Sequence, residues 1–157
     1  AQMERVLSAA AACLLTMGLV SQGVTAGPVT PAEVKISDGE IKTSLTGSAG
    51  SAVKGREWFK NRKLGNCLAC HVNSELKEEQ FHGEVGPALD GVAERWNEAQ
   101  LRAIVVNSKI IFGEKTMMPA FYRDNGFTRP LKKFKGKTIL SAEQIEDIVA
   151  YLRTLKE

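Results

Sequence analysis

The clearest hydrophobic pattern lies near the C-terminal end of the chain, where apolar residues repeat at spacings of three and four residues. The repeating positions are Ile145, Ile148, Val149, Leu152 and Leu155. Ser141 precedes them as a candidate N-cap, and Gln144 follows three residues later, as in a capping box. This pattern predicts an amphipathic helix that closes the chain.

Two further segments show helical spacing. Residues 97–106 begin with the capping-box pair Asn97 and Gln100 and continue with apolar residues on one face. Residues 51–64 place Val53, Trp58 and Phe59 at roughly helical spacing, with basic residues elsewhere. Loops rich in Gly and Pro separate these segments, and no convincing alternating strand pattern appears. The chain is therefore predicted to be all-α.

The N-terminal part differs in character. One Arg, an apolar stretch over residues 6–20 and small residues ending at Ala26 are typical of a secretory signal peptide. The stretch is shorter than the ~20 residues of a membrane-spanning helix, so neither a membrane anchor nor a lipid anchor on Cys13 is favoured. Residues 1–26 are thus predicted to be a signal peptide, which would direct the protein out of the cytoplasm.

Residues 27–50 are rich in Gly, Pro, Ser and Thr and predict an extended arm before a domain at 51–157. The arm is interpreted either as a flexible tail or as a segment that lies on its own domain or on a partner. Composition agrees with one globular domain, because 43% of the 157 residues are hydrophobic and 25% are charged. The formal charge of +3 gives no indication of nucleic-acid binding.

The sequence Cys67-Leu68-Ala69-Cys70-His71 is a C-x-x-C-H motif, the attachment motif of c-type haem. Two thiols at this spacing can each add to one vinyl group of a haem, and the following His can then bind the iron. A dithiol redox site would require a βαβ setting that the chain lacks. A structural zinc site would require further ligands, and outside the signal peptide His82 is the only other His or Cys. The motif therefore predicts one covalent haem c held by Cys67 and Cys70, with His71 as an iron ligand.

The second iron ligand is predicted by elimination. Outside the signal peptide the only methionines are Met117 and Met118, in a loop that contains Pro119. A Met thioether opposite a His suits an electron carrier, because it raises the reduction potential. Met118 is preferred because Pro119 fixes the backbone directly after it. Met117 and His82 remain the alternatives. With both axial positions filled, the iron would carry electrons and bind no substrate.

From about residue 51 onward, the chain resembles the class I cytochromes c. The matches, in order, are Gly55-x-x-x-Phe59, Cys67-x-x-Cys70-His71, Gly86-Pro87-Ala88-Leu89-x-Gly91, Met118-Pro119, and Tyr151 with Leu155. The resemblance implies a class I cytochrome c-like fold around a covalent haem, in which Gly55 and Phe59 meet Tyr151 and Leu152 or Leu155. It also implies that the Pro87 carbonyl accepts a hydrogen bond from His71 and orients its ring.

A narrower resemblance is to the SoxX family, the monohaem subunits of bacterial SoxAX thiosulfate-oxidising complexes. The matching stretches are Thr116–Gly126 and Lys135–Lys156. The resemblance implies a periplasmic heterodimer with a SoxA cytochrome that joins thiosulfate oxidatively to a cysteine of the SoxYZ carrier. Electrons would leave through a downstream cytochrome.

Because the haem would consume Cys67 and Cys70, the mature chain has no thiol for sulfur chemistry. It is therefore expected to carry electrons, while the sulfur-transfer site lies on the partner. The alternative is a free-standing diffusible cytochrome; a haem sensor is disfavoured, because a filled sixth position resists gas binding. The arm is expected to distinguish the first two functions, since a subunit could lay it on its partner.

Overall fold

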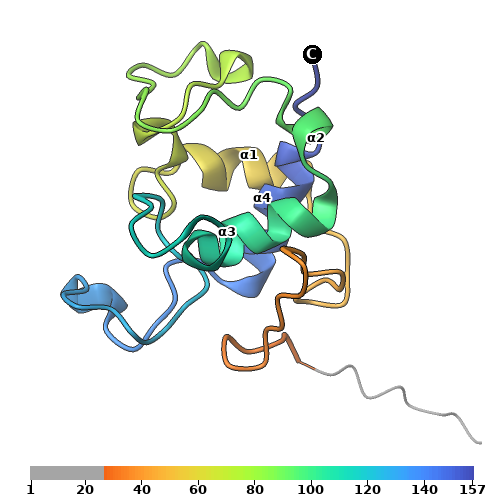
Figure 1. Cartoon of the computed structure of the whole chain (residues 1–157). Helices are drawn as coiled ribbons and strands as arrows, with labels where there is room; N and C mark the ends of the chain where they lie inside the picture. The colour runs from red at the N-terminus through yellow and green to blue at the C-terminus, as the bar shows by residue number, and fades with distance from the viewer. Residues whose placement is uncertain (1–26) are drawn as a thin grey trace, which may run out of the picture.

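The computed structural model describes residues 27–157, and the predicted signal peptide lies outside them. The described residues form the helices α1 (Ala52–Lys60), α2 (Val92–Arg95), α3 (Glu98–Phe112) and α4 (Ala142–Leu152), with short 3₁₀ turns η1 (Cys67–Ala69), η2 (Ser74–Leu76) and η3 (Lys132–Phe134). Within residues 27–157 there is no strand, only an isolated bridge between Ser37 and Glu40. The all-α prediction is confirmed (Figure 1).

The centre of the fold is the crossing of α1 and α4 (Figure 1). A Cβ atom on Gly55 would lie 1.9 Å from the Asp147 carbonyl oxygen, so only glycine allows the two backbones to approach this closely. One turn later the Phe59 ring meets the Tyr151 ring edge-to-face at 5.4 Å between centroids. These are the contacts that the cytochrome resemblance implied.

The helix ends follow local hydrogen bonds. Both predicted capping boxes are present, at Asn97 with Gln100 and at Ser141 with Gln144. The first helix was predicted to reach residue 64 but ends at Lys60, because Asn61 turns to extended backbone and its NH donates to the Trp58 carbonyl. The second helix was predicted to end at residue 106 but continues to Phe112 through a kink at Asn107.

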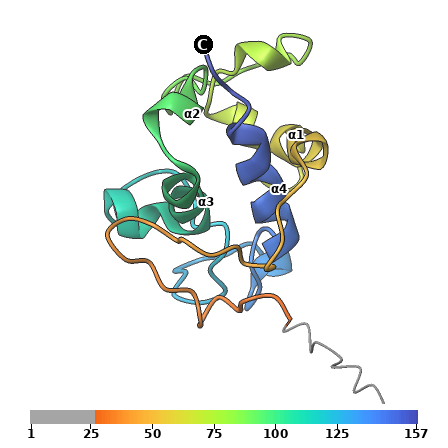
Figure 2. The same ribbon diagram turned by 90° about the vertical axis from the view of Figure 1, so that its right-hand side faces the viewer.

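The arm lies on its own domain, along α3 and α4 (Figure 2). Ile41 and Leu45 are buried in the core, and the Ile41 NH donates to the Ala99 carbonyl at 3.0 Å. Beneath them, Arg102 and Glu146 are each 3% exposed and form an ion pair at 2.8 Å. Arg102 also donates to the Ile41 carbonyl at 2.9 Å, and Glu146 accepts from the Leu45 NH at 2.8 Å. The arm is thus an integral part of the fold, and its presence does not distinguish a subunit from a free carrier.

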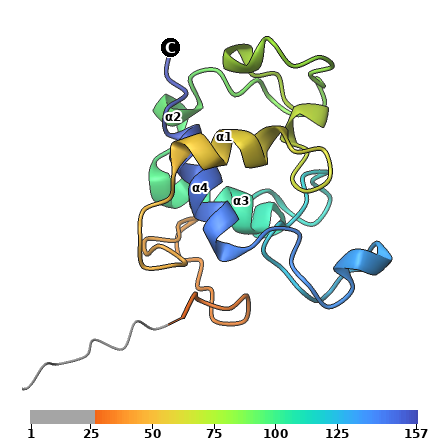
Figure 3. The same cartoon turned by 180° about the vertical axis from the view of Figure 1, so that it is seen from behind.

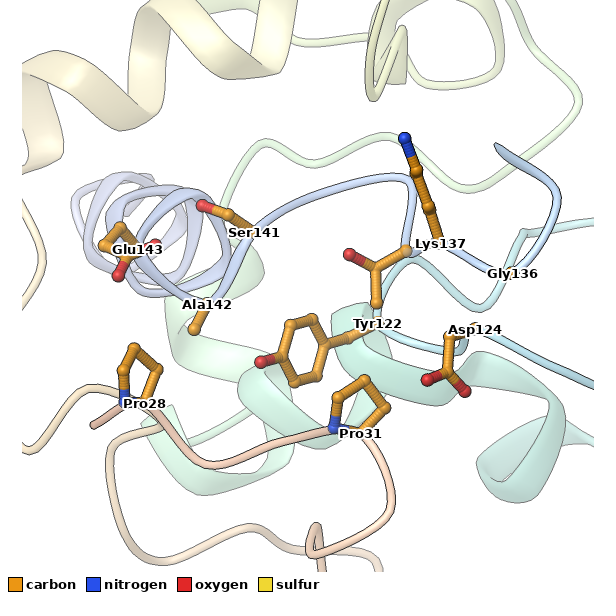
Figure 4. A pocket seen from close by; sticks show the side chains of 10 residues that line it. Pro28, Pro31, Tyr122, Asp124, Gly136, Lys137, Ser141, Ala142 and Glu143 are labelled. Atoms are coloured by element: carbon orange, nitrogen blue, oxygen red, sulfur yellow. The ribbon is translucent and has the colours of Figure 1, made fainter. Parts of the chain in front are cut away.

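A pocket of about 400 Å³ lies where the start of the arm passes the N-terminal end of α4 (Figure 4). Pro28, Pro31 and Tyr122 line it, and the Tyr122 hydroxyl donates to the Val29 carbonyl at 2.7 Å. None of its lining residues belongs to the segment that carries the C-x-x-C-H motif. The pocket is therefore separate from the predicted haem site.

The segment between Phe121 and Leu140 projects from the body of the molecule (Figures 1 and 3). Its base is closed by the NH groups of Ile139 and Leu140, which both donate to the Phe121 carbonyl at 3.1 Å. Its tip, which contains η3, is tied back at one point, where the Lys133 ammonium donates to the Lys63 carbonyl at 3.0 Å. Among the helices of residues 27–157, none has the length and apolar character that a membrane crossing requires.

Candidate functional site

The C-x-x-C-H motif forms a tight turn directly after α1. Asn66 adopts the left-handed conformation (φ 50°), which Asn tolerates better than most residues. The 3₁₀ turn η1 follows, and the NH groups of Cys70 and His71 both donate to the Cys67 carbonyl, at 3.1 and 3.0 Å. Cys67 and Cys70 are half-buried and form no disulfide. The turn thus holds both thiols and the His within one short segment.

The environment of the Cys67 thiol disfavours its ionisation to a thiolate. Burial raises the pKa of Cys67 to about 12, and the neighbouring Cys70 adds to this effect. Reactive dithiols instead have lowered pKa values, since the thiolate is the nucleophile. Within residues 27–157, no group of three or more His, Cys, Asp or Glu side chains is placed to hold a metal ion.

The His71 ring is fixed by the loop that carries Gly86 and Pro87. Its Nδ1 lies 2.7 Å from the Pro87 carbonyl oxygen. A carbonyl can only accept, so Nδ1 carries the proton and Nε2 keeps its lone pair free for a metal. A Cβ on Gly86 would lie 2.4 Å from His71 Cε1, so the loop backbone packs directly against the ring. The hydrogen bond implied by the resemblance is therefore present, and Gly86 makes it sterically feasible.

The loop after α3 presents its two methionines differently. Met117 is 77% exposed, whereas Met118 is partly buried against the core. The buried Ser108 hydroxyl donates to the Met118 carbonyl at 2.7 Å and lies 3.2 Å from the Pro119 carbonyl. The Lys109 ammonium donates to the Thr116 carbonyl. The last turns of α3 thus hold the loop so that Met118 faces inward.

This role of α3 was not predicted from the sequence. At Asn107 the helix backbone leaves helical geometry (φ −152°, ψ 81°), and Ser108 directly follows the kink. The signal was the Asn-Ser pair, which interrupts a run of apolar residues and whose side chains compete for backbone hydrogen bonds. Asn107 Oδ1 is buried and has no hydrogen-bond partner, which leaves an unsatisfied polar atom beside the methionine loop.

The structure gives His82 a different environment. Its Nδ1 accepts from the Asn73 NH at 3.3 Å, and its Nε2 lies 3.1 Å from the Leu76 carbonyl. Both ring nitrogens are thus engaged with the backbone of the segment that follows His71. This arrangement favours Met118 over His82 as the second ligand.

In Figures 1 and 3 the C-x-x-C-H turn and the methionine loop lie at the same end of the molecule, where α1 ends. This end offers two thiols, an imidazole with a free Nε2 and a partly buried thioether. Such a donor set fits a covalently attached haem with His and Met ligands. Because Gly86 has no side chain, its loop can pack against the imidazole without a steric clash.

Comparison with known proteins agrees with this interpretation. Residues 52–156 match the family model described as Cytochrome c. The chain belongs to the cytochrome c family. A search of curated proteins gives no match.

A solved structure narrows the relationship. The chain is similar to a chain in the crystal structure of SoxXA from P. pantotrophus, with 47% sequence identity and a TM-score of 0.77. The match covers 83% of this chain and 99% of that chain. The predicted resemblance to SoxX, the cytochrome c fold and the covalent haem c on Cys67 and Cys70 are thereby confirmed.

Proposed function

We propose that this chain is the electron-transfer subunit of a periplasmic complex of the SoxXA type. The observation that carries the proposal is the 47% identity over 99% of the SoxXA chain, together with a complete C-x-x-C-H turn. A free-standing carrier is not favoured, because the similar structure is that of a two-component complex. The proposed partners are a SoxA-type cytochrome, the SoxYZ carrier reached through the complex, and a downstream cytochrome.

We propose His71 and Met118 as the axial ligands and Pro87 as the residue that orients His71. The 2.7 Å contact between His71 Nδ1 and the Pro87 oxygen supports this assignment, as does the partial burial of Met118. When bound, the haem supplies one-electron redox chemistry at its iron. The chain would contribute an imidazole fixed by its hydrogen bond to Pro87, a thioether loop held by Ser108, and the half-buried turn that carries the two attachment cysteines.

The sulfur chemistry is assigned to the partner. Joining a carrier thiolate to thiosulfate forms an S–S bond and releases a pair of electrons. Both cysteines of residues 27–157 are attachment residues, so this part of the chain has no thiol to serve as the nucleophile. The chain therefore accepts these electrons singly and passes them to the downstream acceptor.

The test is a reconstitution with thiosulfate and the carrier protein. The complex of this chain with a SoxA-type subunit should reduce an added electron acceptor only when thiosulfate and the carrier protein are present. The haem of this chain should become reduced during turnover. The isolated holoprotein should accept electrons from a chemical reductant but show no sulfur transfer. Turnover by the isolated chain, or a haem that stays oxidised during turnover of the complex, would overturn the proposal.

The ligand assignment has its own test. Met118→Ala should abolish the sulfur-to-iron charge-transfer band of the oxidised protein, while Met117→Ala should keep it, because Met117 is 77% exposed. Retention of the band in Met118→Ala would refute Met118 as the ligand. Loss in both variants would instead indicate that the loop as a whole has moved.

A further inference from the structure

Six asparagines occur in the chain, and Asn125 is the one that is followed by glycine. The residues that follow the other asparagines are Arg62, Cys67, Ser74, Glu98 and Ser108. The backbone nitrogen of the following residue can attack an asparagine side chain, and a side chain on that residue hinders the attack. Glycine has no side chain and gives the backbone its greatest freedom. The local sequence therefore makes Asn125 the asparagine that is most open to this reaction.

The tertiary structure leaves this pair unrestrained. Asn125 and Gly126 are both exposed, in the segment that projects between Phe121 and Leu140 (Figures 1 and 3). Within residues 27–157, the stretch 123–130 takes part in no backbone–backbone hydrogen bond. The Gly126 NH, which would supply the attacking nitrogen, has no acceptor among the described residues. A stretch without such bonds changes conformation at little cost in free energy.

The contacts around the turn are few and weak. The Asn125 side chain donates through Nδ2 to the carboxylate of its neighbour Asp124 at 2.8 Å. Gly126 has a φ of 72°, and a Cβ placed on it would meet nothing closer than Arg123 Cζ at 3.9 Å. The Arg123 guanidinium donates to the Gly126 carbonyl at 3.4 Å, which is longer than a typical hydrogen bond. The turn therefore has both the space and the freedom to rearrange.

Three of the other asparagines are engaged in the fold. Asn97 caps α3, where its side chain accepts from the Gln100 NH at 2.9 Å. Asn73 is fully buried, and its side chain donates to the Tyr151 hydroxyl at 2.9 Å. The Asn61 side chain accepts from the backbone NH two residues later, at 2.9 Å. Each of these side chains would lose a hydrogen bond before its amide carbon could be attacked.

We propose that Asn125 is a site of spontaneous deamidation, through which the folded protein converts to a more acidic form as it ages. The Gly126 nitrogen attacks Asn125 Cγ, and the new C–N bond closes a succinimide ring. The Cγ–Nδ2 bond breaks, and the side-chain nitrogen leaves as ammonia with the proton of the Gly126 NH. Water then opens the ring at either carbonyl, which leaves an aspartate or an isoaspartate. The reaction needs neither the haem nor a partner, so it is independent of the proposed function.

The product changes the charge of the projecting segment. Residues 121–140 hold six Lys or Arg side chains and one acidic residue, Asp124. Deamidation adds a second carboxylate directly after it. An isoaspartate would also lengthen the backbone between Arg123 and the Gly126 carbonyl that it bonds. The hydrogen bonds that close the base of the segment at Phe121 lie outside the altered turn, so the domain should keep its stability.

The test is incubation of the haem-loaded protein in a mildly alkaline buffer, followed by isoelectric focusing and peptide mass spectrometry. Trypsin releases Asn125 in the peptide 124–132, because Pro130 prevents cleavage after Arg129. The wild type should form a band with one more negative charge, and the mass change from amide to acid should lie in that peptide alone. Asn125→Gln should lose the band, because its longer side chain closes a larger ring much more slowly. Asn61→Gln is the matched control and should form the band at the wild-type rate.

A second comparison tests whether the fold leaves the turn unrestrained. The rate in the folded protein should lie within about tenfold of the rate in a synthetic peptide of residues 120–130, because a turn without backbone hydrogen bonds opens at little cost. A larger slowing in the folded protein would show that the fold holds the turn, and it would overturn the proposal. An acidic band that persists in Asn125→Gln, or a mass change in another peptide of the wild type, would overturn it as well.

Discussion

Arg102→Met is the sharpest test of how the arm is held. The Arg102 guanidinium is 3% exposed and donates to Glu146 at 2.8 and 3.0 Å, to the Ile41 carbonyl at 2.9 Å and to Glu98 at 2.7 Å. Burial alone would lower the pKa of Arg102, but the hydrogen bonds to Glu146 and Glu98 raise it above the usual value. The group is therefore a permanent charge at the centre of the contact between arm and domain.

Removing the guanidinium leaves the Glu146 carboxylate buried, with the Leu45 NH as its neighbour. Breaking a buried pair by removing one partner costs about 3–5 kcal/mol. A domain of this kind has ~5–15 kcal/mol of total stability, so the variant should lose about a fifth of it or more. The double variant Arg102→Met/Glu146→Leu removes both charges and should recover about 2 kcal/mol of that loss.

The assay is urea unfolding of the haem-loaded proteins, followed by far-ultraviolet circular dichroism. Limited trypsin digestion reports on the arm, where cleavage after Lys35 or Lys42 should become faster in Arg102→Met. Arg153→Met is the matched control. Arg153 also pairs with Glu98, at 2.9 Å, but is 44% exposed, so its loss should cost less than about 1 kcal/mol. Equal losses in Arg102→Met and Arg153→Met, or a double variant less stable than Arg102→Met, would refute the reasoning.

Three further predictions concern the helix crossing, the His71 ring and Tyr151. Gly55→Ala should lower the free energy of unfolding by about 1–3 kcal/mol, because its Cβ would lie 1.9 Å from the Asp147 oxygen. Val53→Ala, at an exposed position, is the control and should change the free energy by less than ~0.5 kcal/mol in the same urea titration. Equal effects of the two substitutions would contradict the close crossing of the helices. Gly86→Ala places a methyl group 2.4 Å from His71 Cε1, so it should displace the ring and shift the Soret band of the haem-loaded protein; an unchanged band would contradict the contact. Burial, together with a hydrogen bond to Glu75, raises the pKa of Tyr151, so its contribution to stability is full below the unfolded pKa of ~10 and is lost as pH rises above it. Tyr151→Phe should make the loss of stability above pH ~10 shallower, and identical alkaline slopes would argue against this role.

The parts of the fold that could be predicted depend on residues close together in sequence. The capping boxes at Asn97 and Ser141 each join residues three positions apart, and both are present. The kink at Asn107 and the extension of α3 to Phe112 could not be predicted from periodicity. The helix there bends so that Ser108 can bond the methionine loop, and that partner lies ten residues further along the chain.

The candidate site divides in the same way. The C-x-x-C-H spacing is itself the chemical requirement for attaching a haem, so Cys67, Cys70 and His71 could be identified without a structure. The choice between Met117 and Met118 rested on Pro119 alone, and the difference in burial of the two side chains adds the physical reason. The hydrogen bond from Ser108 to the methionine loop and the contact of Gly86 with the imidazole depend on the tertiary structure and could not be predicted.

By itself, the sequence determined the haem chemistry and the three main helices, because these depend on short-range spacing of thiols, caps and apolar residues. Tertiary structure decided where the arm lies and which side chains are exposed. The Leu45 NH and the Glu146 carboxylate are 101 residues apart in the chain, yet they share one hydrogen bond. No local pattern encodes such a pair, because each group acquires its partner only when burial excludes water from both.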